Sequence, residues 1–237
     1  MNNQLFSIDN AVILAAGFAS RFAPISYHTP KALLSVRGEI LIERQIRQLL
    51  EAGIHDIYIV TGYLKEQFSY LADKYGVHLI ENHEYDKRNN HSSIWAARDV
   101  LSNTYICSSD NYFTENVFSP EEDRPFYSAL YTDEQTDEYC LTTDGTGKIT
   151  DVTIGGSASW YMMGHVLFDQ TFFRTFLRIL EHEYNLPGTT DLLWEQIYMK
   201  HLEELTLYIR QYPGDVILEF DTVAELAQFD TAYQQYL

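Results

Sequence analysis

Short apolar runs alternate with amphipathic segments through the first half of the chain. The apolar runs have the length and composition of buried strands, and they cover residues 11–14, 56–61, 77–81 and 104–108. The amphipathic segments have the 3.6-residue period of helices, and they cover residues 40–52, 64–74 and 93–101. Strands that alternate with helices form parallel sheets with right-handed crossovers. The pattern therefore predicts an α/β fold.

The second half of the chain has a different pattern. Short β-type runs separated by turn residues cover residues 126–131, 139–143, 148–154 and 159–168. Helices are predicted over 170–183 and 191–202, followed by a strand over 216–220 and a terminal helix over 223–236. We therefore expect antiparallel strands added to, or folded over, the parallel core, and Asp221-Thr222 as the cap of the last helix.

Composition and charge narrow the class of protein. The chain has 237 residues, of which 46% are hydrophobic, and its formal net charge is -18. This acidity disfavours nucleic-acid binding and favours a small-molecule partner. The sequence contains no apolar run of about 18 residues, and the segment MNNQLFSIDN lacks the features of a signal peptide. With Cys107 and Cys140 in no metal or redox spacing, these features predict a cytoplasmic protein with reduced, buried thiols and no membrane insertion.

One acid-free window stands out against this background. No Asp or Glu occurs from Asn10 to Gly38, where a glycine turn follows the first apolar run. Gly17 allows backbone N–H groups to approach a phosphate, and Arg21 and Lys31 supply positive charge for a triphosphate. The spacing matches neither the Walker A pattern nor the dinucleotide pattern G-x-G-x-x-G. The window therefore predicts an anion site of another kind.

The motif L-A-A-G-x-x-x-R-x-x-P followed by P-K-A-L resembles the signature of nucleotidyltransferases, which join a nucleoside triphosphate to a phosphorylated small molecule and release pyrophosphate. Within that family the likeness is greatest to bacterial CTP:phosphocholine cytidylyltransferases, and it extends over residues 54–65, 66–77, 89–90, 109–112 and 219–221. The resemblance implies a Rossmann-like, mixed but mostly parallel sheet flanked by helices, with a small antiparallel substrate lobe. It also implies one nucleotidyltransferase domain over 1–237, with a nucleotide-binding half at about 10–115 and an acceptor-binding part at about 116–237.

The same resemblance assigns residues to CTP. It implies that Arg21 and Lys31 are catalytic and bind the triphosphate and the attacking phosphate. The base is expected over the loop backbone, which consists of Leu14, Ala15, Ala16 and Gly17. Asn90 is the first choice for reading cytosine, and capping of a helix start is an equally good explanation of this residue.

Two carboxylates are expected to bind Mg²⁺, which prefers one or two carboxylates together with substrate phosphate. Asp110 follows a predicted strand and is the first ligand that the resemblance implies. Asp221 is the second, with helix capping as its alternative role. Where the phosphocholine enzymes have Asp-x-Asp-Asn, this chain has Ser108 at the first position, so the first carboxylate is missing.

The acceptor residues depart from the phosphocholine pattern as well. Tyr139 stands where those enzymes use a tryptophan, and Leu193 stands where they use a tyrosine. The residues expected to bind the acceptor are Tyr139, Trp160, Asp191, Trp194 and Glu219. Aromatic faces bind a quaternary ammonium, whereas carboxylates offset its charge. For Trp160 and Trp194, packing in the core is the alternative.

These features predict a Mg²⁺-dependent cytidylyltransferase that makes CDP-choline and pyrophosphate from CTP and phosphocholine. The altered cage leaves other acceptors open, namely phosphoethanolamine, 2-aminoethylphosphonate or a sugar 1-phosphate. A nucleotide-sensing domain without catalysis is the non-enzymatic alternative, and it predicts loss of Lys31 or Asp110, which are both present. The oligomeric state is not indicated by any pattern in the sequence.

Overall fold

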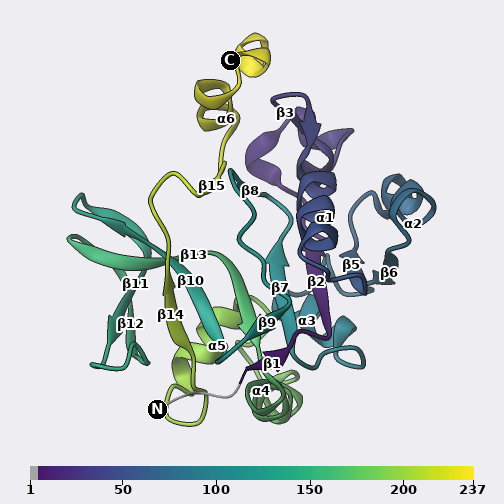
Figure 1. The fold of residues 1–237 in the computed structure, drawn as a ribbon. Helices are drawn as coiled ribbons and strands as arrows, with labels where there is room; N and C mark the ends of the chain where they lie inside the picture. The colour runs from purple at the N-terminus through teal and green to yellow at the C-terminus, as the bar shows by residue number, and fades with distance from the viewer. Residues whose placement is uncertain (1–4) are drawn as a thin grey trace.

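A central sheet flanked by helices forms the body of the protein (Figure 1). The computed structural model describes residues 5–237. The first four residues of the segment MNNQLFSIDN, on which the signal-peptide prediction rests, therefore lie outside the described residues. The main path of this sheet has the order β12-β11-β13-β7-β2-β5-β6. Its parallel part consists of β2 (Asn10–Ala15), β5 (Ile57–Thr61), β6 (His78–Glu81) and β7 (Thr104–Ser108). The predicted parallel α/β core is therefore confirmed.

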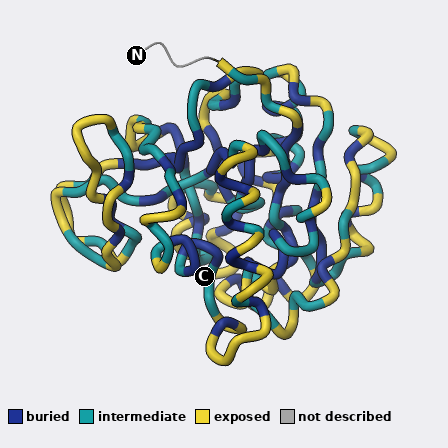
Figure 2. Tube along the Cα trace, turned by 90° about the horizontal axis from the view of Figure 1, so that it is seen from below, coloured by how far each residue is buried: buried dark blue, intermediate teal, exposed yellow. Residues whose placement is uncertain are grey.

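Alternate residues of these strands face two different helical layers, as the pleat of a strand requires. Val12 packs in a cluster with α3 (His91–Ala97), α4 (Gln170–Glu183) and α5 (Trp194–Lys200). Its neighbour Ile13 packs in a second cluster with α1 (Leu41–Glu51) and α2 (Ser69–Tyr75). Figure 2 shows many buried residues inside the body of the protein and many exposed residues in its peripheral loops. The result is a three-layer α/β arrangement in which both faces of the parallel strands are covered.

The second half adds the expected antiparallel strands. They are β10 (Phe126–Thr132), β11 (Thr136–Thr143), β12 (Ile149–Gly156) and β13 (Ser159–Phe168). The long β13 pairs with β7 near its end and with β11 near its start, while β10 pairs along its other edge. The hairpin of β11 and β12 extends away from the parallel strands (Figure 1). A strand that the pattern did not predict, β14 (Tyr208–Gln211), runs parallel to β10.

Three short strand pairs complete the fold. They are β1 (Phe6–Ser7) with β9 (Glu121–Glu122), β3 (Ser35–Val36) with β4 (Glu39–Ile40), and β8 (Asn111–Phe113) with β15 (Ile217–Glu219). The last pair matters for the site, because it joins the chain just after β7 to the chain near the C-terminus.

Several helix boundaries differ from the prediction. The predicted terminal helix is two elements, α6 (Val223–Phe229) and a 3-10 helix (Thr231–Tyr236), because Asp230 is extended and its carboxylate accepts the Ala232 N–H. The helix predicted from 191 begins at Trp194, since Leu193 has extended backbone angles. The segment predicted as a helix over 64–74 starts with a 3-10 turn (Lys65–Phe68) before α2.

Both cysteines are buried and free, as predicted, and burial raises the pKa of the Cys107 thiol. Within residues 5–237, no helix has the length and apolar character needed to cross a membrane.

Candidate active site

The loop after β2 forms one wall of a cavity at the carboxyl edge of the parallel strands. Ser109 N–H donates to the Leu14 carbonyl at 3.2 Å, and Tyr63 N–H donates to the Ala16 carbonyl at 3.1 Å. These bonds join the loop to the segments that follow β7 and β5. Ala19 has φ 47° and ψ 49°, the left-handed region that favours glycine, before the 3-10 turn Ser20–Phe22. The edge where the parallel strands end is the usual position for ligands in open α/β sheets.

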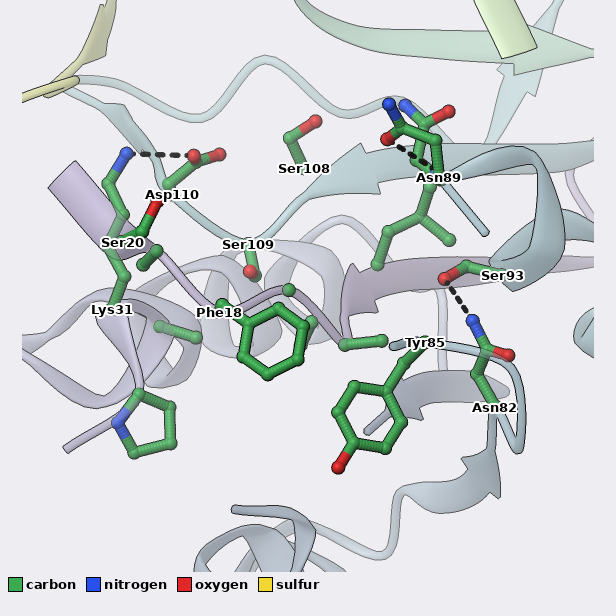
Figure 3. Close-up of a pocket in the computed structure, with 18 of the residues that line it drawn as sticks. Phe18, Ser20, Lys31, Asn82, Tyr85, Asn89, Ser93, Ser108, Ser109 and Asp110 are labelled. Carbon is green, nitrogen blue, oxygen red and sulfur yellow. Dashed lines mark hydrogen bonds and ion pairs between the residues drawn. The ribbon is translucent and has the colours of Figure 1, made fainter. Parts of the chain in front are cut away.

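The cavity has a volume of about 750 Å³ (Figure 3). Ten of the predicted site residues line it: Leu14, Ala15, Ala16, Gly17, Arg21, Lys31, Asn90, Asp110, Asp191 and Asp221. The structure thus brings together residues from both halves of the chain. The lining does not include four predicted acceptor residues: Tyr139, Trp160, Trp194 and Glu219.

Each predicted phosphate-binding cation is paired with a predicted metal ligand. Lys31 Nζ donates to Asp110 Oδ2 at 2.9 Å, a contact drawn in Figure 3. Arg21 donates to Asp221 Oδ1 at 2.7 Å, on the more exposed side of the cavity. The Asp221 carboxylate therefore faces Arg21, while Thr222 caps α6 by accepting the Glu225 N–H. Helix capping by Asp221 is thus not what the structure shows.

Asp110 lies in a turn that is hydrogen-bonded to a side chain of α1. Gln45, which is fully buried, donates from Nε2 to the carbonyls of Ser108 and Asn111 at 2.9 and 2.8 Å. Asn111 in turn donates to Glu219 Oε2 at 2.9 Å. The turn that carries Asp110 is therefore fixed on both sides of this residue.

Glu219 lies close to the carboxylates of the cavity although it does not line it. The negative charge of Asp110, together with burial, raises the pKa of Glu219 to about 8, while Lys31 opposes this effect. Burial and the charge of Asp221 raise the pKa of Glu138. Within residues 5–237, no group of three or more His, Cys, Asp or Glu side chains is arranged to hold a metal ion.

Asn90 joins two helices at the wall of the cavity. Its Oδ1 accepts the Trp194 N–H at 2.7 Å, and its Nδ2 donates to Glu195 Oε2 at 3.2 Å. Asn90 has no side-chain hydrogen bond that caps α3. The Asn90 side chain therefore accepts a hydrogen bond from the start of α5. The capping alternative had placed this residue at the start of its own helix, α3, which it does not cap.

Comparisons with known proteins identify the family of the chain. A family model described as a MobA-like NTP transferase domain matches residues 11–118. The chain is 40% identical over 228 residues to a 2-aminoethylphosphonate cytidylyltransferase of Lancefieldella rimae, covering 94% of this chain and 93% of the relative. It is 34% identical over 220 residues to a choline-phosphate cytidylyltransferase of Streptococcus pneumoniae, covering 93% and 96%. The chain belongs to the nucleotidyltransferase family.

The structure agrees with this membership. The solved structure of the CTP:phosphocholine cytidylyltransferase from Streptococcus pneumoniae superimposes with a TM-score of 0.90 at 33% identity, over 96% of this chain and 99% of that one. The fold, the enzyme class and the resemblance predicted from the sequence are therefore confirmed, and cytidylyl transfer is the supported activity within the family.

An aromatic group of this nucleotidyltransferase lies next to the loop. The Phe18 ring is 45% exposed and lies 5.0 Å from the Tyr63 ring and 5.4 Å from the Tyr85 ring, measured between centroids. Phe18 and Tyr85 lie side by side in the cavity (Figure 3). A Cβ on Gly62 would come within 2.6 Å of Tyr85, so glycine is required for this approach. The rings of Phe18 and Tyr85 are apolar surfaces in a cavity that is otherwise lined mostly by polar groups.

The two tryptophans expected at the acceptor end have different surroundings. Trp194 is 2% exposed and packs against Tyr127, with a centroid distance of 5.7 Å, and against Phe168 at 5.2 Å. This core position corrects the expectation that its ring is available to a ligand, and it matches the packing alternative. Trp160 is partly buried and lies 5.4 Å from the ring of Tyr131.

Sequence reasoning missed several residues of this nucleotidyltransferase site. Asn82 is buried, lines the cavity and donates to the hydroxyls of Ser92 and Ser93 at 2.8 and 3.1 Å. It follows β6, and a polar residue directly after a predicted parallel strand is a usable signal. Gln45 carries no such signal, because a glutamine within a helix is ordinary.

Proposed function

We propose that the protein transfers a cytidylyl group from CTP to a small molecule with a phosphonate or phosphate at one end and a primary ammonium at the other, with 2-aminoethylphosphonate as the preferred acceptor. The observation that carries the choice of acceptor is the loss of aromatic rings and the presence of a carboxylate. Trp194 is buried in the core, and the resemblance puts Leu193 where the phosphocholine enzymes use a tyrosine. Asp191 lines the cavity with a carboxylate that takes no part in the ion pairs of Arg21 and Lys31.

A primary ammonium is recognised by hydrogen-bond acceptors, since it has three N–H donors and a compact charge. A trimethylammonium group has no N–H donor and depends on aromatic faces. The Asp191 carboxylate in the cavity wall therefore favours the primary ammonium. The relative from Lancefieldella rimae supports the same acceptor.

Phosphocholine is the second candidate, and specific observations favour it. Tyr139 and Trp160 are partly exposed and lie on the paired strands β11 and β13, so some aromatic surface remains outside the cavity lining. The similarity to the pneumococcal choline-phosphate enzyme supports this acceptor too.

Nucleotidyl transfer is an in-line attack by an acceptor oxygen on the α-phosphorus of CTP, with pyrophosphate as the leaving group. Protein groups contribute mainly by orientation and by neutralising charge. In this proposal Arg21 and Lys31 bind the triphosphate and the attacking group, and the backbone of residues 14–17 supports the nucleotide.

Mg²⁺ fits the residues of this site. Asp110 and Asp221 are oxygen donors that line one cavity, and magnesium is usually held by one or two carboxylates together with substrate phosphates. We propose these two residues as its ligands. When bound, the ion would neutralise charge that develops on the phosphate oxygens.

Pyrophosphate release measured for a matrix of substrates tests the proposal. The nucleotides are CTP, UTP and ATP, and the acceptors are 2-aminoethylphosphonate, phosphoethanolamine, phosphocholine and glucose 1-phosphate. Phosphoethanolamine and phosphocholine differ only in the methyl groups, so their comparison isolates the recognition of the ammonium.

We expect the highest kcat/KM with CTP and 2-aminoethylphosphonate, and phosphoethanolamine ahead of phosphocholine. A higher kcat/KM with phosphocholine than with either amine would show that phosphocholine, the second candidate, is the preferred acceptor. Absence of turnover with CTP and every ammonium-bearing acceptor would overturn the proposal.

A further inference from the structure

Five hydrogen bonds join the start of α3 to the segment that leads into α5. The two segments are about a hundred residues apart in the sequence, and both line the cavity. The bonds are Asn89 N to Thr190 O at 2.9 Å, Asn89 Nδ2 to Asp191 O at 3.0 Å, His91 Nδ1 to Leu192 O at 2.7 Å, Trp194 N to Asn90 Oδ1 at 2.7 Å, and Asn90 Nδ2 to Glu195 Oε2 at 3.2 Å. Of the two α5 residues that bond the Asn90 side chain, only Glu195 contributes a side chain, because Trp194 uses its backbone N–H.

Glu195 is buried in a way that needs explanation. Glu195 is 9% exposed. The Tyr127 hydroxyl donates a hydrogen bond to its second carboxyl oxygen, Oε1, at 3.2 Å. Burial raises the pKa of Glu195 to about 7, although the bonds from Asn90 and Tyr127 act in the opposite direction. A well-packed apolar residue is often at least as favourable as a buried ionisable one, so stability alone does not account for a carboxyl group here.

The two bonds to α5 fix the orientation of the Asn90 amide. An asparagine side chain has two N–H donors and two acceptor lone pairs. The contacts described for residues 5–237 use one donor and one lone pair of Asn90, which leaves one of each for a ligand in the cavity. If Oδ1 and Nδ2 exchanged places, the amide nitrogen would face the Trp194 N–H and the amide oxygen would face the Glu195 carboxylate.

We propose that Glu195 is a positioning residue for the nucleotide: it holds the Asn90 amide in the one orientation that presents a donor and an acceptor to the base of CTP. This inference rests on the proposed function in that CTP is the ligand of the cavity. Cytosine carries both an exocyclic amine and ring acceptors, which suits a side chain that offers both kinds of group.

Two substitutions separate geometry from charge. Glu195→Gln keeps the length of the side chain, so Oε1 can still accept from Asn90 while Nε2 donates to the Tyr127 hydroxyl. Glu195→Asp keeps the carboxyl group but is shorter by one methylene group, so it cannot reach both partners. Tyr127→Phe removes the other partner of Glu195 and leaves Asn90 bound, and Glu203→Gln changes an exposed glutamate beyond α5 as a control.

Calorimetric titration with CTP and Mg²⁺, without acceptor, measures the Kd of each variant. We expect Glu195→Asp to weaken CTP binding about tenfold or more, since a hydrogen bond to a buried group is lost. Glu195→Gln, Tyr127→Phe and Glu203→Gln should remain within about threefold of the parent protein. In steady-state assays the Glu195→Asp variant should raise the KM for CTP more than it lowers kcat.

A loss in Glu195→Gln as large as that in Glu195→Asp would overturn the inference, because Glu195→Gln keeps a side chain long enough to accept the hydrogen bond from Asn90. An unchanged Kd for folded Glu195→Asp would overturn it as well. If Glu195→Asp does not fold, the test rests on Glu195→Gln. A tenfold weaker binding of CTP by this variant would then overturn the inference. Because the titration contains no acceptor, a parent protein that binds CTP but uses none of the acceptors contradicts the proposed function and leaves this test intact.

Discussion

Lys31 Nζ lies 2.9 Å from Asp110 Oδ2, although the two residues are 79 positions apart in the chain. Arg21 and Asp221 form an equivalent pair at 2.7 Å across the same cavity. Each cation proposed for the triphosphate therefore balances a carboxylate proposed for the metal. Binding of the triphosphate together with Mg²⁺ would let these groups exchange partners without leaving an unpaired charge, since phosphate would face the cations and the metal would face the carboxylates.

The Lys31–Asp110 pair leads to the first prediction. Asp110→Asn should reduce kcat/KM for pyrophosphate release by about 10² to 10⁴, the range found for groups that stabilise transition-state charge. The melting temperature should change little, because the asparagine oxygen can still accept the hydrogen bond from Lys31 Nζ. Asp133→Asn, in an exposed turn, is the control. Near-normal activity of the Asp110 variant would remove this residue from the mechanism.

A second prediction concerns the support of Asp110 by α1. Gln45→Met keeps the volume of the side chain but leaves the carbonyls of Ser108 and Asn111 without its two hydrogen bonds. We expect a loss of about 1–3 kcal/mol in the free energy of unfolding, measured with urea. We also expect a fall of about tenfold or more in kcat, because the turn that carries Asp110 is released.

Gln48→Met is the matched control for this experiment. Gln48 lies on the same helix and donates to the carbonyls of Phe113 and Glu115, which do not flank Asp110. This variant should lose similar stability with a smaller effect on kcat. If both variants lost activity equally, the role of Gln45 would be that of general support for the fold.

These contacts also show where prediction from the sequence stops. The strands around β2 and the whole of α4 follow from periodicity, because one face of each element must be buried and this requirement is written in the residue pattern. The loop with Arg21 and Lys31 could be located because an acid-free window is unusual in so acidic a chain.

The remaining features depend on contacts between distant segments. Gln45 donates to two carbonyls that lie 63 and 66 positions further along the chain, on either side of Asp110. No local pattern distinguishes this residue from a surface glutamine. The short β14 is stabilised by pairing with β10, which lies far away in the sequence. Trp194 looks the same in a sequence whether its ring packs in a core or faces a ligand, so its burial had to come from the structure.

Protonation of Glu195 gives a prediction about pH. The pKa of Glu195 is raised to about 7 by burial, whereas an ordinary glutamate has a pKa of 4.5. Between these values the folded protein retains a proton that the unfolded chain has released, so the contribution of Glu195 to the free energy of unfolding falls as pH rises from about 4.5 to about 7. Tyr127 and Tyr139 face this carboxyl, and both have raised pKa values, so neither loses its proton in this range.

Glu195→Gln removes this titration. The free energy of unfolding of this variant, relative to that of the parent protein, should therefore increase by roughly 1–3 kcal/mol between pH 5 and pH 7. Above pH 7 the difference should stay constant. Urea denaturation at pH 5, 6, 7 and 8 measures the difference. A difference that does not depend on pH would show that Glu195 is ionised throughout.

Ala19 provides a fourth prediction, on the strain of the loop. Its φ of 47° lies in the left-handed region, which costs an alanine about 1–2 kcal/mol. Ala19→Gly relieves this strain but increases the entropy of the unfolded chain by about 0.5–1 kcal/mol. The free energy of unfolding should therefore rise by up to about 1 kcal/mol. Ala158→Gly, at φ 48° in the turn between β12 and β13, should give a similar gain away from the cavity. Loss of stability in both variants would contradict the strain.

The position of Trp194 gives the last prediction, which distinguishes a core residue from a cage residue. Because its ring is 2% exposed and packs against Tyr127 and Phe168, Trp194→Ala should lower the free energy of unfolding by about 3–5 kcal/mol. Trp194→Phe retains much of this packing and should leave the KM for the acceptor within about threefold. Tyr139→Ala, at a partly exposed position outside the cavity lining, is the comparison, and it should raise the KM for phosphocholine more than the KM for CTP. A Trp194→Phe variant with unchanged stability and a selectively raised KM for the acceptor would show instead that this ring contacts the acceptor during turnover, and that α5 must then move to expose it.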